Sequence, residues 1–335
     1  MANPEISVII PVKNGGFVFE ECLASLRVSQ GTSYEIVVMD DGSTDSSVEI
    51  AKRYFCHLIE LPYSMGPSHA RNRGAKVARG DILFFIDADI IVRKNALQKI
   101  SSIFQNKEVV AITGVLSDGM RYKNFSSQFK NLWMRYSYIT MPDIVSLFYT
   151  SVAAIRRELF LKSGGFDTGY RRPSVEDTDF GQRLEMMGYE VHLKRDLEVE
   201  HVKYYSLPGL LRTDFCRSAD MFKMTLRRGL RRLLECRNKT SIPISFMLGV
   251  VLYSLALFTI LIGFIFPSMV LTCFLLSGIF VFTIFLLNRS FLHWLKIQKG
   301  WWFSSRSFFF MFLDIPVVIM GIISGAVDYI SGNKY

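Results

Sequence analysis

The sequence predicts an α/β fold, a mostly parallel sheet with helices on both faces, followed by interfacial amphipathic helices and a C-terminal transmembrane region. Three observations predict it. Short apolar segments alternate with helix-like segments over the first half of the chain. A strongly basic stretch comes next. Beyond it, residues 242–287 contain no Asp, Glu, Lys or Arg. We therefore expect three parts, at 1–202, 203–240 and 241–335.

The strands of the first part are predicted from near-continuous apolar runs, which are typical of buried parallel strands. These runs lie at 6–12, 35–40, 57–61, 81–87, 109–115, 148–155 and 190–193. Between them, helix-like composition bordered by turn residues predicts helices. The predicted helices lie at 17–29, 46–54, 68–78, 125–138 and 179–187.

Polar clusters follow three of these strands. "KNGG", "DDGSTDSS" and "DAD" each begin where an apolar run ends. Open α/β sheets bind their ligands beyond the carboxyl ends of the strands. The clusters therefore predict a ligand site at that edge.

The positive charge of the chain is local. The net charge is +9, but residues 1–202 contain 24 basic and 25 acidic residues, whereas 203–240 contain ten basic and three acidic ones. A nucleic-acid-binding domain would carry a basic face on its folded part, so we expect no nucleic-acid partner. Basic segments beside apolar ones instead indicate anionic lipid headgroups.

The apolar C-terminal part predicts a multi-pass membrane protein. Residues 207–234 are expected to form amphipathic helices at the membrane surface. Spans are predicted at 244–266, 269–287 and 307–330, each near the 20 residues that a crossing needs. Basic residues before the first span and between the second and third place those flanks in the cytosol, with Pro267 and Tyr335 on the far side. Asp314, inside the third span, is expected to make a polar contact between helices, and the alternative places it near a lipid phosphate or a basic partner.

The location of the first part is predicted from two further features. The N-terminus, "MANPEISVII", lacks the basic start and long apolar core of a signal peptide. The five cysteines are scattered without a CxxC pair, which suits a reducing compartment. We expect this domain in the cytosol, on the plasma or inner membrane of a prokaryote.

The stretch "FFIDADI" contains Asp87 and Asp89, which are expected at the end of a strand. Residues two apart on a strand point to the same side, so both carboxylates could reach one ligand. Paired oxygen ligands suit Mg²⁺ or Mn²⁺ when substrate phosphates complete the coordination. The alternative for an isolated D-x-D pair is a solvated turn.

Four stretches in a fixed order resemble the nucleotide-sugar-dependent glycosyltransferases of family 2, which have the GT-A fold. The stretches are "IIPVKN", "VVMDDGSTDSS", "GPSHARNRGAKVARGDILFFIDADI" and "GGFD…VEDTDFGQRLEMMGYEV". The resemblance covers residues 6–201. It implies a nucleoside-diphosphate sugar donor, a divalent cation, and transfer with inversion at the anomeric carbon.

The resemblance also implies roles on the donor side. Pro11 and Val12 line the nucleotide pocket, and Asp41 binds the base. An Asx turn before a helix is the other interpretation of Asp41, and Asp40 receives no role. Arg71 approaches the nucleotide or diphosphate, with a solvated helix arginine as the alternative. Asp87, in this scheme, faces the sugar and ribose, and both aspartates of the D-x-D pair are metal candidates, Asp89 as the direct ligand.

On the acceptor side, the resemblance implies that Asp177 is the general base, with Glu176 as the reserve candidate. Asp179 is expected to be a first-turn acid that the helix dipole favours. His201 corresponds to a further metal ligand in related enzymes, and its alternative is a structural histidine.

One signature of the wider family is absent. The Q-x-x-R-W motif of processive synthases is missing, since only "DFCRSAD" occupies its place. We therefore expect transfer of one sugar to a lipid or lipid-linked saccharide at the cytosolic membrane face. The alternatives are a polyprenyl-phosphate sugar synthase and an inactive membrane scaffold that binds the nucleotide sugar without turnover.

Overall fold

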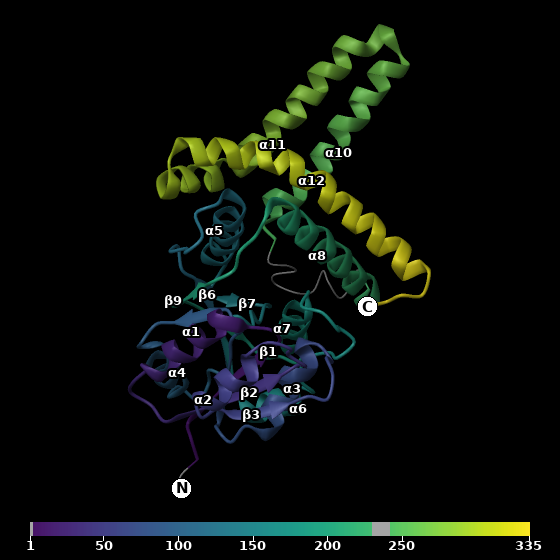
Figure 1. Ribbon diagram of the computed structural model, residues 1–335. Coiled ribbons are helices and arrows are strands. Elements are labelled where there is room, and N and C mark those ends of the chain that lie inside the picture. The colour runs from purple at the N-terminus through teal and green to yellow at the C-terminus, as the bar shows by residue number, and fades with distance from the viewer. Residues whose placement is uncertain (1–2, 230–241) are drawn as a thin grey trace. The chain divides into compact units, whose positions relative to one another are not determined.

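The computed structural model describes residues 3–229 and 242–335, which form two compact units (Figure 1). The first contains the chain up to Tyr204, the end of helix α8 from Met224 on, and Tyr335. The second contains residues 205–223 and 242–334. The predicted amphipathic region continues to residue 234, and its part beyond residue 229 lies outside the described residues.

A sheet of nine strands forms the centre of the first unit. Its order is β3-β2-β1-β4-β8-β6-β9-β5, and β7 pairs with β9. The strands are β1 Ile6–Val12, β2 Tyr34–Asp40, β3 His57–Glu60, β4 Ile82–Phe85, β5 Ile90–Val92, β6 Ala111–Leu116, β7 Ile144–Val145, β8 Ala153–Arg156 and β9 Val191–His201.

The sheet is mixed, and its parallel part confirms the predicted fold class. The strands β3, β2, β1 and β4 are parallel neighbours, as are β6 and β9. Antiparallel pairing enters where β8 lies between β4 and β6, and again where β5 and β7 pair with β9. Of the parallel strands, β1, β2 and β4 bury nearly every side chain, which explains their continuous apolar sequence, whereas β3 at the edge of the sheet buries none.

Two strands differ from the prediction in a way that shapes the site. The strand β4 ends at Phe85, so Asp87 and Asp89 lie in the turn between β4 and β5 and not on a strand. The expectation that strand alternation aims both carboxylates the same way was therefore wrong. The strand β9 continues eight residues past the predicted end, up to His201, because alternating apolar residues bury one of its faces despite the charges between them.

Helices follow the strands of the first unit and cover its apolar core. They are α1 Gly16–Arg27, α2 Ser47–Arg53, α3 Pro67–Val77, α4 Ala96–Phe104, α5 Phe125–Ile139, α6 Arg157–Lys162 and α7 Glu176–Met186. Five buried phenylalanines with mutual ring contacts connect β4, α6 and α7: Phe85, Phe148, Phe160, Phe166 and Phe180. This cluster supports the segment that leads into α7.

The second unit is helical. It contains α8 Leu207–Arg228 up to Lys223, then α10 Ile244–Ile265, a short 3-10 turn Pro267–Met269, α11 Val270–Lys299 and α12 Trp301–Ile330. The three last helices are long and apolar enough to cross a membrane, by length and composition. Figure 1 shows α10 and α11 as a hairpin, as predicted.

The charged stretch 288–306, between the second and third predicted spans, is helical on both sides of Gly300. Gly300 has a φ of 86°, a conformation that favours glycine, and it separates α11 from α12. Asp314 is buried on α12, and its expected polar contact between helices stays a prediction.

Candidate active site

The two aspartates that follow β2 hold neighbouring loops. Asp40 accepts hydrogen bonds from the backbone N–H of Ser43, which closes the turn after the strand. Asp41 is buried and accepts from the N–H groups of Met65 and Gly66, at 2.7 and 3.1 Å, and from Ser64 Oγ at 2.8 Å. The turn interpretation therefore belongs to Asp40, and Asp41 fixes the loop before α3. Its contact with a base stays a prediction.

The end of β1 lies beside these loops. Pro11 pairs with Met39 of β2, and the carbonyl of Val12 accepts a hydrogen bond from the N–H of Asp41. Both predicted pocket residues are thus at the carboxyl edge of the sheet. The loop before α3 requires glycine at position 66. Gly66 has a φ of 92°, and a Cβ there would overlap the backbone of Arg171.

Arg71 connects the donor motif with α7. Its side chain is 3% exposed, so the alternative of a solvated helix arginine was wrong. Nη2 lies 2.6 Å from Asp87 Oδ1 and Nη1 lies 2.9 Å from Glu176 Oε1. Burial alone would lower the pKa of Arg71, but these two carboxylates raise it. The guanidinium is therefore a permanent charge shared by the two acids.

Both oxygens of the Asp87 carboxylate accept hydrogen bonds from protein groups. Oδ1 accepts from Arg71, and Oδ2 accepts from Ser151 Oγ at 2.7 Å. Sequence reasoning missed Ser151, because a serine before an apolar strand carries no signal of its own. The geometry turns Asp87 toward protein partners, and its roles toward sugar and metal stay predictions.

Asp89 and His201 lie together. His201 Nε2 is 3.4 Å from Asp89 Oδ2, because Ile90 and His201 are paired residues of β5 and β9. Asp89 Oδ1 is buried and has no hydrogen-bond partner. Burial would raise the pKa of Asp89, but the charge of His201 and its hydrogen bond lower it overall.

This pair fits part of a divalent metal site. A carboxylate oxygen without a partner next to an imidazole nitrogen is a suitable donor set, which substrate phosphates can complete. Within residues 3–229 and 242–335, no group of three or more His, Cys, Asp or Glu side chains is placed to hold a metal. The metal set of Asp87, Asp89 and His201 stays a prediction.

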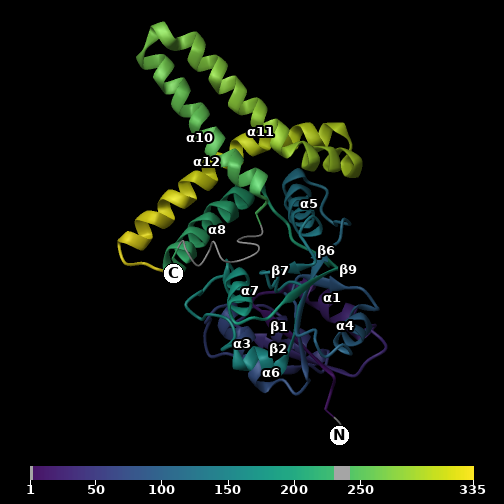
Figure 2. The same ribbon diagram turned by 180° about the vertical axis from the view of Figure 1, so that it is seen from behind.

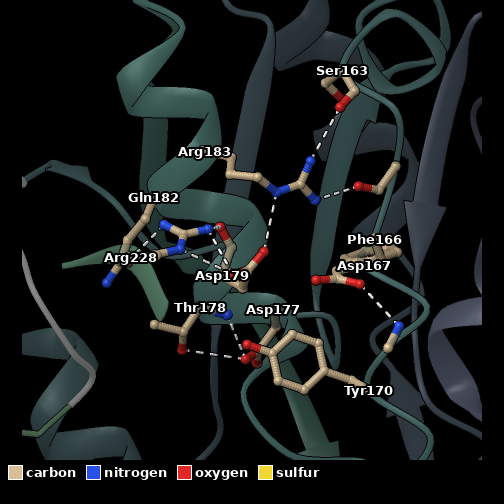
Figure 3. A network of polar contacts seen from close by, with 12 residues as sticks. Ser163, Phe166, Asp167, Tyr170, Asp177, Thr178, Asp179, Gln182, Arg183 and Arg228 are labelled. Carbon is tan, nitrogen blue, oxygen red and sulfur yellow. Dashed lines mark hydrogen bonds and ion pairs between the residues drawn. The ribbon is translucent and has the colours of Figure 1, made fainter. Parts of the chain in front are cut away.

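The α7 helix begins with the predicted carboxylates, Glu176, Asp177 and Asp179. Glu176 is buried, paired with Arg71, and accepts from the N–H of Ser174 at 2.7 Å. Asp177 accepts from the N–H of Thr178 at 2.6 Å and from its hydroxyl at 3.3 Å (Figure 3). Glu176 is therefore committed to a structural ion pair, which makes it the weaker candidate for a base.

Asp179 has a larger part than a first-turn acid. Its carboxylate is held between two arginines (Figure 3): Arg228 Nη2 is 2.6 Å from Oδ1, and Arg183 Nε is 3.1 Å from Oδ2. Arg228 also donates to Gln182 Oε1 at 2.9 Å, and Arg183 donates to the carbonyls of Ser163 and Gly165. The last turn of α8 is thereby attached to α7.

Arg227 holds the loop that precedes α7. Its guanidinium lies 4.9 Å from the ring centre of Tyr170 and 3.8 Å from that of Tyr335, and it donates to the Tyr170 hydroxyl. The Tyr335 hydroxyl donates to Asp167 at 3.0 Å. Arg227 and Arg228 were predicted only as basic flanks of the first span. Their charge gave no sign of these contacts, which join distant parts of the chain.

Comparisons with known proteins agree with this architecture. The sequence profile described as "Glycosyl transferase family 2" matches residues 7–164. An uncharacterised protein of Mycobacterium tuberculosis is 30% identical over 219 residues, 59% of this chain and 67% of the relative. The O-antigen chain rhamnosyltransferase WbaN of Salmonella anatum is 26% identical over 215 residues, 61% of this chain and 68% of the relative. Three other curated relatives are matched over only about a quarter to a half of their own length.

Among solved structures, the mannosyltransferase PcManGT of Pyrobaculum calidifontis, in complex with GDP-Man and Mn²⁺, superposes with a TM-score of 0.56. The match covers 98% of this chain and 88% of that one at 18% identity. This similarity concerns the fold, and it agrees with the GT-A architecture that the motifs predicted.

Proposed function

Because the chain belongs to glycosyltransferase family 2, we propose that it transfers a single sugar from a nucleoside-diphosphate donor to an acceptor at a membrane. One observation carries the proposal. The turn that contains Asp87 and the carboxylate pair at the start of α7 are connected by a single buried arginine, Arg71. A donor motif and a candidate base are thus held by one rigid link, as a two-substrate reaction requires.

The donor would lie at the carboxyl ends of β1, β2 and β4. Asp41 fixes the loop at 64–66, and Pro11 and Val12 border the same edge. A divalent cation held by Asp89 and His201 would offset negative charge on the departing diphosphate. The Mn²⁺ in the complex of PcManGT supports this choice of ion.

The chemical step begins at Asp177, the candidate general base. Asp177 accepts the proton of an acceptor hydroxyl, whose oxygen forms a bond to the anomeric carbon. The bond between that carbon and the phosphate oxygen breaks, and the nucleoside diphosphate leaves with the electron pair. A single displacement inverts the anomeric centre. The acceptor proton ends on Asp177, which carries a carboxylate suited to general base catalysis.

The acceptor is proposed to be a lipid or lipid-linked saccharide on the cytosolic side of a prokaryotic plasma or inner membrane. Two features support it: three helices apolar enough to cross a membrane, and ten basic residues among 203–240. WbaN, which acts on an O-antigen chain, is a relative in keeping with a saccharide acceptor.

The full-length protein in lipid nanodiscs tests the proposal. It is incubated with Mn²⁺, a panel of nucleoside-diphosphate sugars and polyprenyl-linked saccharides, and products are identified by mass spectrometry. We expect one donor to be consumed and one sugar to be added. Asp177→Asn should lower turnover on the order of 10²- to 10⁴-fold, the range of general base catalysis, while donor affinity stays unchanged.

Asp81→Asn is the matched control, because Asp81 is exposed at the opposite, amino end of β4 and its replacement should leave turnover intact. Equal turnover of Asp177→Asn and the wild type would remove Asp177 from the mechanism. Absence of transfer with intact donor binding across the whole panel would favour the scaffold alternative.

A further inference from the structure

Helix α12 has two different faces. From Phe309 on, its large exposed apolar side chains recur at intervals of three, four or seven residues and so form one stripe. The stripe consists of Phe309, Leu313, Met320, Ile323, Val327 and Ile330. The other face is packed, and the most apolar 18-residue window of α12 is 39% buried, against 17% for each of the two preceding helices. A one-sided stripe is typical of a helix that lies on a membrane surface.

The packed face of α12 lies against α8. An added Cβ at Gly321 would overlap the carbonyl of Phe215, and one at Gly325 would overlap the backbone of Ala219. The contact advances by four residues on both helices, so they are parallel and in close contact over at least one turn. Figures 1 and 2 both show the C-terminal half of α12 beside α8.

Helix α8 is too charged for the interior of a bilayer. Arg217 lies within the stretch in contact with α12, Asp220 and Lys223 follow it, and Arg212 and Asp214 precede it. Asp220 and Lys223 form an ion pair at 3.1 Å. Each such residue costs about 2.5–3.5 kcal/mol at the centre of a membrane helix. The half of α12 that packs on α8 is therefore outside the hydrocarbon core as well.

The contact between α12 and α10 is a second, independent indication of where α12 lies relative to the membrane. Phe246, in the first turn of α10, packs with Met311, Ile315 and Val318 from the middle of α12. With 22 residues, α10 is roughly 33 Å long, close to the hydrocarbon thickness. Two spanning helices would meet near their midpoints. Here the middle of α12 meets the first half of α10, from Phe246 to Tyr253, whose ring centre lies 6.1 Å from that of Phe312.

We propose that α12 lies flat at the membrane interface beside α8, with its apolar stripe on the lipid, and that only the α10–α11 hairpin crosses. Lys296, Lys299 and Arg306 at the junction of α11 and α12 would contact anionic headgroups. This topology has two crossings in place of the predicted three. It puts the end of α12 on the side where α10 begins. It rests on the proposed membrane hairpin and is independent of sugar transfer.

Cysteine labelling in intact cells tests the topology. In the full chain with its five cysteines replaced by alanine, single cysteines are introduced by Ser268→Cys, Ser331→Cys and Lys107→Cys, all at exposed positions. A membrane-impermeant maleimide should label Ser268→Cys in intact cells, and the other two only after permeabilisation. Labelling of Ser331→Cys in intact cells together with Ser268→Cys would overturn the proposal. Protection of Ser268→Cys itself would contradict the membrane hairpin and with it both topologies.

Depth measurements distinguish a flat helix from a tilted one. A fluorophore on Leu313→Cys, Met320→Cys or Val327→Cys, in liposomes with lipids that carry quenchers at known depths, should report one shallow depth at all three positions. A spanning helix would instead spread Leu313 and Val327 by roughly 21 Å. In α10, Val251→Cys and Leu261→Cys are matched controls, since both residues are 56% exposed and lie about 15 Å apart along a helix that crosses, so they should report two different depths. A stepwise change of depth along α12 would refute the flat position.

Discussion

Nη1 of Arg71 lies 2.9 Å from Oε1 of Glu176, although 105 positions separate the two residues in the chain. The same guanidinium binds Asp87 through Nη2, so one buried cation neutralises two acids from different elements. Removal of one partner from such a group leaves uncompensated charge, which is more costly than the loss of a hydrogen bond.

The first prediction concerns this cation. Arg71→Met should destabilise the protein by about 3–5 kcal/mol and abolish transfer, because the buried Glu176 and the half-buried Asp87 would lose their counter-charge. Arg71→Lys should recover part of the stability, since an ammonium keeps the charge but lacks the fork that reaches both acids. Thermal unfolding of the full chain in detergent measures the loss. Arg73→Met, at an exposed position of the same helix, is the control. Equal midpoints for the two methionine variants would contradict the structural role of Arg71.

The second prediction concerns the metal. EDTA should stop transfer, and added Mn²⁺ or Mg²⁺ should restore it. Asp89→Asn and His201→Gln should weaken Mn²⁺ binding on the order of 10- to 100-fold, a range that even supporting residues of metal sites reach. Electron paramagnetic resonance of free Mn²⁺ measures this without any turnover.

His192→Gln is the matched control for the metal site, because His192 lies on the same strand but beside Glu190. Full transfer after exhaustive chelation, or Mn²⁺ binding that both variants leave unchanged, would exclude the proposed ligands.

The third prediction concerns the attachment of α8 to α7. Arg228→Met should cost about 1.5–3 kcal/mol, the value of hydrogen bonds to a charged group, because Arg183 continues to neutralise Asp179. Combining it with Asp179→Asn should cost less than the sum of the single changes, since the two residues form one pair. Thermal shifts of the single and double variants give the coupling. Arg212→Met, on an exposed part of the same helix, should have little effect. Strict additivity would mean that the pair contributes no coupling energy.

The fourth prediction concerns acid stability. Burial alone would raise the pKa of Glu35, but hydrogen bonds from Ser7 Oγ and Arg79, and the charge of Arg79, lower it below the ordinary value. A carboxylate whose pKa is lower in the folded state stabilises the protein at pH values above its unfolded-state pKa of about 4.3. This stabilisation is lost as the pH falls through the folded-state pKa. Glu35→Gln should therefore lower the unfolding midpoint at pH 7 and lose its effect in acid. Glu108→Gln, at an exposed position, should show no such pH dependence. If the unfolding midpoints of Glu35→Gln and the wild type differ by the same amount at pH 7 and in acid, the ionised carboxylate of Glu35 is not the cause of the stabilisation.

Much of the site could be predicted because its signals are local. The continuous apolar runs of β1, β2 and β4 placed the polar clusters at one edge of the sheet. The resemblance to family 2 assigned the D-x-D pair and the acids of α7 to the site. The partners of these acids were not, since Ser151 and Arg228 come from elements whose position depends on the packing of the whole domain.

The sequence by itself determined the α/β alternation, the apolar hairpin and the order of the family motifs, because periodicity and composition depend on neighbours along the chain. Only the tertiary structure decided that Asp87 and Asp89 lie in a turn with different partners, that β9 extends to His201, and that α12 packs against a charged helix. Each of these depends on contacts between residues far apart in the chain, and the free energy of such contacts is set by burial and charge pairing that no local pattern contains.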